Sequence, residues 1–200
     1  MLVAGDDLAC EVVARTLAAA GVGRLVLLRR TGPLAPPVAA ALTGSNPRVR
    51  IETRPWPTAG GWLAALAEAT VVVRSGFDDD PLLRAAIRLG LPVVVMRGRE
   101  DRMEVLSFRR HGPCPHAPLD VPEKTSGTPA EDGAGAVVAA HLAAAEVLVV
   151  LSGATTGAAS ARHITIGGDS IGDIVARAVD IPWAPECFAC GGGGMEMSFS

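Results

Sequence analysis

The chain opens with a strand–helix–strand unit that fits into 28 residues. Residues 1–4 form a short apolar strand, residues 8–20 carry apolar side chains at helical spacing, and residues 25–28 form a second apolar strand. A helix that joins two fully apolar strands predicts a parallel crossover. We therefore expect a doubly wound α/β domain.

Later segments continue this alternation. A Pro-rich entry at 33–37 leads into an Ala-rich helix that ends near Asn46, and Gly135 closes a loop rich in Pro, Gly and Ser that begins at residue 112. The remaining expected helices are 62–69, 81–89 and 136–151, and the expected strands are 48–53, 71–73, 92–96, 162–168 and 174–179. This pattern predicts a mostly parallel Rossmann-like sheet with helices on both faces and a short antiparallel C-terminal portion. We expect one domain over 1–190, with the long loop 112–135, and a disordered tail over 191–200.

Composition excludes several function classes. Of 18 basic residues only Lys124 is a lysine, the net charge is −3, and aromatic residues make up 4% of the chain with no tyrosine. A nucleic-acid coat or base-stacking platform is therefore not expected. The most apolar stretch, 134–151, is interrupted by His141 and Glu146 and falls short of the ~20 residues that span a bilayer, so we expect a buried helix and no membrane partner. No secretory signal is apparent, which favours a cytoplasmic protein.

The first turn carries carboxylates where a nucleotide-binding fold needs glycines. Between Ala4 and Ala9 it reads Gly-Asp-Asp-Leu, so Asp6 or Asp7 is expected to cap the following helix. A polyphosphate at this helix N-terminus would meet two like charges. The turn thus predicts a capped helix that no longer binds nucleotide, in preference to a working phosphate loop.

The end of the second strand carries a basic pair. Dinucleotide and ATP folds place an acidic residue here to hold the ribose hydroxyls, whereas this chain has Arg29 followed by Arg30. The pair could accept a 2′-phosphate, but without a glycine-rich turn a solvated basic strand end is favoured.

Two clusters could hold metals. Cys114 and His116, together with Cys187 and Cys190, supply ligand types that suit tetrahedral zinc, with His111 as a substitute ligand; a redox pair or unligated cysteines are the alternatives. Asp78 to Asp80 could bind magnesium, although capping of the helix that starts at Pro81 is favoured.

The order of these pieces resembles the ThiF/MoeB/ubiquitin-activating-enzyme superfamily. The opening segment ends its helix in Ala-Gly-Val-Gly at 20–23, Asn46-Pro47 precedes the third strand, and Leu89-Gly-Leu-Pro92 precedes another strand. Gly112-Pro-Cys114 matches the place of the first zinc cysteine, residues 135–148 resemble the long helix on the dimer side, and Cys187-x-x-Cys190 resembles the closing zinc pair. The resemblance covers nearly the whole chain and implies a Rossmann-like fold, ATP and magnesium, and adenylation of the C-terminus of a carrier protein or peptide.

Carried over by position, most of the residues that this chemistry needs are different here. The glycines become Ala4, Asp6, Asp7 and Ala9, the ribose acid becomes Arg29, the arginine arm has no counterpart in 31–41, and the lysine expected near Leu34 is missing. The magnesium aspartate falls near Arg74, unless Asp78 has taken its place. These losses remove most of the charge stabilisation that nucleotidyl transfer depends on, so ATP and magnesium are not expected to bind.

Three function classes follow. The favoured one is a non-catalytic accessory or binding subunit for a carrier protein, a leader peptide or a peptide-modifying enzyme, as in natural-product peptide biosynthesis, paired as a homodimer or as a heterodimer with an active homologue. The second is a divergent adenylyltransferase that uses Arg29, Arg74 and Asp78. The third, a dinucleotide-dependent oxidoreductase, is weakest because both parts of its fingerprint are broken.

Overall fold

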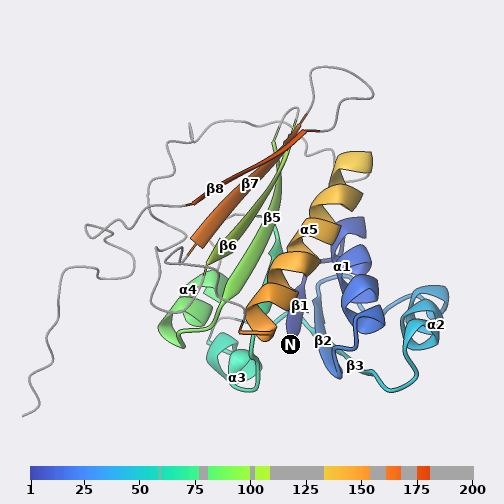
Figure 1. The fold of residues 1–200 in the computed structure, drawn as a ribbon. Coiled ribbons are helices and arrows are strands. Elements are labelled where there is room, and N and C mark those ends of the chain that lie inside the picture. The colour runs from blue at the N-terminus through green and yellow to red at the C-terminus, as the bar shows by residue number, and fades with distance from the viewer. Residues whose placement is uncertain are drawn as a thin grey trace, which may run out of the picture.

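The computed structural model describes residues 1–58, 60–76, 81–99, 102–108, 133–153, 161–167 and 175–180. Within these residues a single eight-stranded sheet runs in the order β3-β2-β1-β4-β5-β6-β7-β8 (Figure 1). The strands are β1 (Leu2–Ala4), β2 (Arg24–Arg29), β3 (Arg50–Pro55), β4 (Val72–Ser75), β5 (Val93–Arg99), β6 (Arg102–Phe108), β7 (Ala161–Gly167) and β8 (Val175–Asp180). Strands β1 to β5 pair in parallel and β6 to β8 pair antiparallel, which confirms the expected fold class.

Helices cover both faces of the sheet. One face packs against α1 (Leu8–Ala19), α2 (Pro36–Ser45) and α5 (Ala134–Leu151), and the other packs against α3 (Trp62–Leu66) and α4 (Pro81–Arg88). Each face has its own hydrophobic core, so the central parallel strands β1, β2, β4 and β5, whose side chains point to both faces, carry runs of buried apolar residues, whereas the edge strand β3 is largely polar.

The strand order reverses between β1 and β4, which pair with each other while their connections lead to opposite sides. In doubly wound sheets the crevice outside the carboxyl ends of two such strands is the usual place for a ligand. Residues Gly5 and Gly76 follow these two strands, so they mark the edge at which a site is expected.

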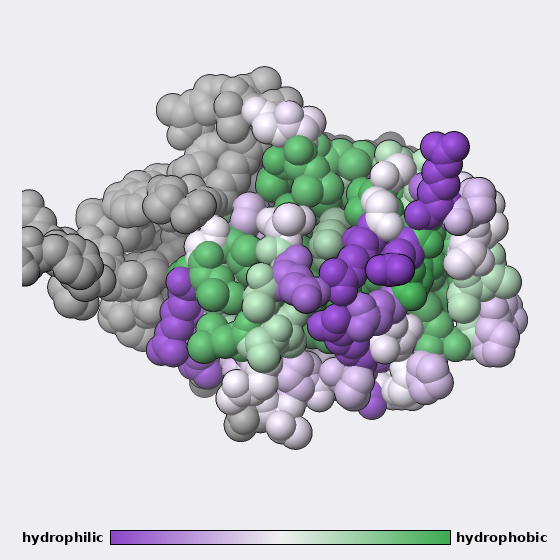
Figure 2. Space-filling model, turned by 90° about the horizontal axis from the view of Figure 1, so that it is seen from below, coloured by the Kyte–Doolittle hydropathy of each residue, from purple (hydrophilic) through white to green (hydrophobic). Residues whose placement is uncertain are grey.

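The opposite edge of the sheet, where the parallel strands begin, is closed by ion pairs. Figure 2 views this end of the molecule and shows a hydrophilic cluster bordered by hydrophobic surface. Arg24 of β2 contacts Glu52 at 3.1 Å and Glu68 at 2.8 Å, and Arg54 contacts Glu52 at 2.6 Å. These contacts tie β2 and β3 to the segment after α3.

Several expected boundaries are wrong. The helix expected at 62–69 ends at Leu66, and α5 begins at Ala134, so the last two residues of the expected loop 112–135 are helical. Strand β6 was not expected at all. Its buried Glu104 and Ser107 interrupt the apolar run, and both find partners only in the folded sheet.

Helix α5 is long and apolar enough, by length and composition, to cross a membrane, with a mean hydropathy of 2.1 over 18 residues. Among the described helices it alone meets that test. It packs against α1 and against β5, β6 and β7, as the core helix of a folded domain does (Figure 1).

Candidate functional site

The turn after β1 is filled by the protein's own side chains. Gly5 has φ +151°, and a Cβ atom there would lie 2.5 Å from Cys10 Sγ and 3.4 Å from the Cβ of Ser75. The buried Cys10 thiol lies 3.5 Å from the Ala4 carbonyl oxygen, to which it donates. Glycine is therefore required here to make room for a thiol, and no phosphate is needed to explain it.

Burial raises the pKa of the Cys10 thiol well above its usual range, and the nearby Asp7 carboxylate raises it further. The thiol is consequently protonated and shielded, which fits a packing role rather than that of a nucleophile.

Asp7, one of the two residues expected to cap the first helix, is the N-cap of α1. The backbone N–H of Cys10 donates to Asp7 Oδ1 at 2.8 Å, and Glu11 N–H donates to the Asp7 carbonyl at 3.3 Å. The carboxylate therefore occupies a backbone donor at this helix N-terminus, which confirms the expected cap.

Asp6 turns away from the helix toward the end of β2. Its carboxylate accepts from Arg30 N–H at 2.9 Å and from Thr31 Oγ1 at 2.8 Å, and it lies 3.1 Å from Arg29 Nε. Partial burial alone would raise the pKa of Asp6, but the hydrogen bonds from Arg30 and Thr31 and the charge of Arg29 together lower it below its usual value.

Arg29 is held inside this turn. Its side chain is 12% exposed, and it contacts Glu11 Oε1 at 3.6 Å in addition to Asp6. The expectation of a solvated strand end is therefore wrong for Arg29, although Arg30 is exposed. Asp6 reaches over from the first turn and places its carboxylate at the end of β2, beside Arg29.

A basic and aromatic cluster lies beside this pair. The Arg30 guanidinium carbon is 4.3 Å from the centroid of the Trp56 ring, and the Arg74 guanidinium carbon is 5.0 Å from it. Trp62 meets Trp56 edge to face, with ring centroids 5.2 Å apart. The strand ladder continues here, because Trp56 N–H donates to the Arg29 carbonyl at 2.8 Å. Sequence reasoning singled out Arg74 but missed Trp56, which no motif marks.

Two buried carboxylates, one on β6 and one on α5, lie at the antiparallel half of the sheet. The sequence analysis did not place either of them in a site. Glu146 of α5 accepts from Ser107 Oγ at 2.9 Å and from Arg162 at 2.6 Å. Glu104 of β6 pairs with Arg97 and lies 3.5 Å from Arg102. The contacts of Glu146 hold α5 against β6 and β7, and the contact of Glu104 with Arg97 holds β6 against β5. Each carboxylate is compensated by at least one arginine.

The other predicted site residues lie either in the core or outside the described residues. Ala4 and Ala9 are buried in the core on either side of the first turn. Asp78, Cys114, His116, Cys187 and Cys190, with His111, lie outside the described residues. Within the part of the chain that the structure describes, no group of three or more His, Cys, Asp or Glu side chains is placed to hold a metal ion.

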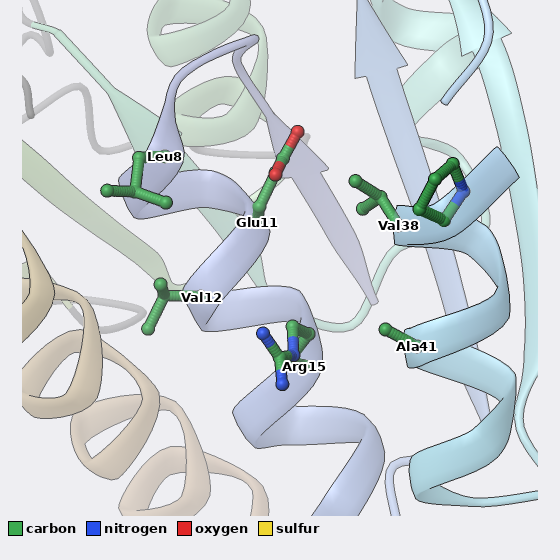
Figure 3. A pocket seen from close by; sticks show the side chains of 7 residues that line it. Leu8, Glu11, Val12, Arg15, Val38 and Ala41 are labelled. Carbon is green, nitrogen blue, oxygen red and sulfur yellow. The ribbon is translucent and has the colours of Figure 1, made fainter. Parts of the chain in front are cut away.

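A groove of about 180 Å³ lies between α1 and α2, on the outer side of the helical layer (Figure 3). Glu11 and Val38 point toward the space between the two helices, and Arg15 lies one turn below Glu11 on α1. The groove is mostly apolar, and its lining consists of Leu8, Glu11, Val12, Arg15, Pro37, Val38 and Ala41.

No known family model matches the chain, and no curated protein matches its sequence. Solved structures do match its fold. A structure of Escherichia coli MccB with ATP superposes with a TM-score of 0.73 at 16% identity, covering 95% of this chain and 65% of MccB. A structure of E. coli MccB with MccA gives 0.72 at 17% identity, covering 95% and 66%. PaaA gives 0.67 at 14% identity, covering 90% and 64%. The chain thus spans about two thirds of the length of these proteins and shares their fold.

Proposed function

We propose that this protein is a non-catalytic, peptide-binding relative of the ThiF-like adenylyltransferases whose nucleotide position is closed by the Asp6–Arg29 pair. Two lines support the proposal: the sequence resemblance to that superfamily and the fold shared with MccB. The observation that carries it is the ion pair between Asp6 and Arg29, with 3.1 Å between Oδ1 and Nε.

The Asp6–Arg29 pair makes this edge unsuitable for a nucleotide in two ways. A ribose requires a carboxylate at the end of β2 as hydrogen-bond acceptor, and Arg29 can only donate. The Asp6 carboxylate is already engaged by Arg30, Thr31 and Arg29. Binding ATP would therefore require breaking these contacts and placing phosphates beside Asp6 and Asp7, whose charges repel them.

A peptide partner is supported by the structural neighbour. MccB has been solved with MccA and shares its fold with 95% of this chain. We propose a carrier protein or leader peptide as the partner of this protein.

We also propose that the protein pairs with a second subunit through α5. The outward face of that helix carries His141 and Ala145, both exposed, and the helix has no charged residue besides the buried Glu146. This surface is weakly polar and suits a protein contact better than water.

A divergent adenylyltransferase is the alternative. One observation favours it: Arg29 and Arg74 both lie at the carboxyl ends of parallel strands, where cations could stabilise the phosphates of ATP. In that case Asp78 would bind magnesium. The two functions differ directly in whether ATP binds.

Calorimetric titration of the full chain with ATP and magnesium tests the proposal. We expect no saturable heat up to millimolar ATP. Replacement of Ala4, Asp6, Asp7 and Ala9 by glycine should not restore binding by itself, because Arg29 still occupies the ribose position. A low-micromolar dissociation constant for the wild type would overturn the proposal and favour the alternative.

A further inference from the structure

Arg30 differs from the other arginines of the carboxyl edge in what surrounds its charge. Arg29 is neutralised by Asp6 and Glu11, whereas the exposed Arg30 guanidinium forms no ion pair with any residue that the structure describes and lies against the Trp56 ring at 4.3 Å. Asp6 does not neutralise that guanidinium, because it accepts from the Arg30 backbone N–H at 2.9 Å.

Three contacts fix the position of Arg30 in advance. Its backbone is held by Asp6, its guanidinium lies over Trp56, and Trp56 itself is braced by the edge contact with Trp62 at 5.2 Å. Stacking on an aromatic face uses the flat side of a guanidinium and leaves its in-plane N–H donors available. A planar fork of donors held in this way matches a carboxylate through two parallel hydrogen bonds.

We propose that Arg30 and Trp56 form an anchor for a carboxylate group of the peptide partner. The inference deepens the proposed peptide-binding function and rests on it. A carboxylate is favoured over a phosphate group because the anchor offers the one guanidinium of Arg30, which has no ion-pair partner among the described residues and balances a single negative charge. The neighbouring helix N-terminus, which would help to hold a dianion, is already capped by Asp7.

The carboxylate can come from an acidic side chain or from a chain terminus, and small probes distinguish these sources. We would titrate the full-length protein with N-acetylaspartic acid α-amide, N-acetylglycine, the neutral N-acetylasparagine amide and inorganic phosphate. The indole N–H signal of Trp56, assigned with Trp56→Phe, reports binding by NMR. We expect a saturable shift with at least one carboxylate probe and none with the neutral amide.

Variants locate the interaction. Arg30→Gln should weaken carboxylate binding by about 10-fold, and Arg30→Lys should weaken it nearly as much because lysine lacks the planar fork. Arg15→Gln, which removes another exposed arginine, is the matched control and should leave the titration unchanged. An equal loss in Arg15→Gln, a shift with the neutral amide, no shift with any probe, or tighter binding of phosphate than of either carboxylate would each overturn the anchor. This titration contains no nucleotide, so a negative result counts against the Arg30–Trp56 anchor. Failure of the proposed function is a separate result, which the calorimetric titration would show as ATP binding.

Discussion

The carboxylate of Asp6 lies 3.1 Å from Nε of Arg29, although 23 residues separate them in the sequence. One residue follows β1 and the other ends β2, and parallel pairing of these strands brings their carboxyl ends together. The carboxylate of this pair therefore belongs to the turn after β1, whereas a dinucleotide-binding fold has its carboxylate at the end of the second strand.

The Asp6 pair predicts a pH-dependent contribution to stability. The folded-state pKa of Asp6 is lowered, so its contribution is fully present above the unfolded value of about 4 and is lost as pH falls through the folded pKa. We expect Asp6→Asn to lower the free energy of unfolding by about 1 kcal/mol at pH 7. Urea denaturation of both proteins should show this difference shrinking below pH 4. An equal difference at pH 7 and pH 3 would contradict the account.

Gly5 and Cys10 should be energetically coupled. Gly5→Ala adds a Cβ that would lie 2.5 Å from Cys10 Sγ and also strains a backbone at φ +151°. The expected loss is about 2–3 kcal/mol in the free energy of unfolding. Cys10→Ala removes the clash but not the strain, so the double variant should lose less than the sum of the two single variants. Simple additivity in chemical denaturation would show that the thiol does not fill this turn.

Substitutions at two alanines of α5 should distinguish an effect on folding from an effect on association. Ala143 is fully buried in this subunit, as are Ala139, Ala140 and Ala144. Ala143→Trp should therefore destabilise the fold by overpacking. Ala145 is exposed, so Ala145→Trp should leave the melting temperature nearly unchanged and weaken association. Light scattering at tens of micromolar checks this; a wild-type monomer would remove the homodimer.

Zinc is predicted from Cys114, His116, Cys187 and Cys190. Protein purified without chelator should contain about one equivalent by atomic emission, and Cys187→Ser should lose it. Cys10→Ser is the matched control, since that thiol is buried in the first turn. Less than about 0.2 equivalents in the wild type would identify the four residues as unligated.

The sequence predicts the fold well because apolar periodicity dominates it. The central parallel strands β1, β2, β4 and β5 and the described helices supply the apolar residues of the two cores, and the edge strand β3 alternates polar residues with the partly buried Ile51. Strand β6 was not predicted because Glu104 and Ser107 are residue types that usually lie at the surface. In the fold, strand pairing brings Arg97 to Glu104, and the packing of α5 brings Glu146 to Ser107. The capped first turn was also predictable, since a cap is a local contact.

The contacts across the carboxyl edge were not predictable. Asp6 looked like an alternative cap and Arg29 like a solvated strand end, and only parallel pairing shows that they neutralise each other. Trp56 follows β3 and meets Arg30 through the same pairing. Each of these contacts joins residues more than 20 positions apart, beyond the range of local sequence patterns.

The backbone amide signals of Arg30 and Thr31 provide the most direct test of the central claim. Arg30 and Thr31 both donate to the Asp6 carboxylate, so their N–H resonances report any ligand that opens this turn. In a ¹H–¹⁵N NMR titration with ATP and magnesium, the account predicts that both signals stay in place up to millimolar nucleotide. Saturable movement of both signals at micromolar ATP would contradict it.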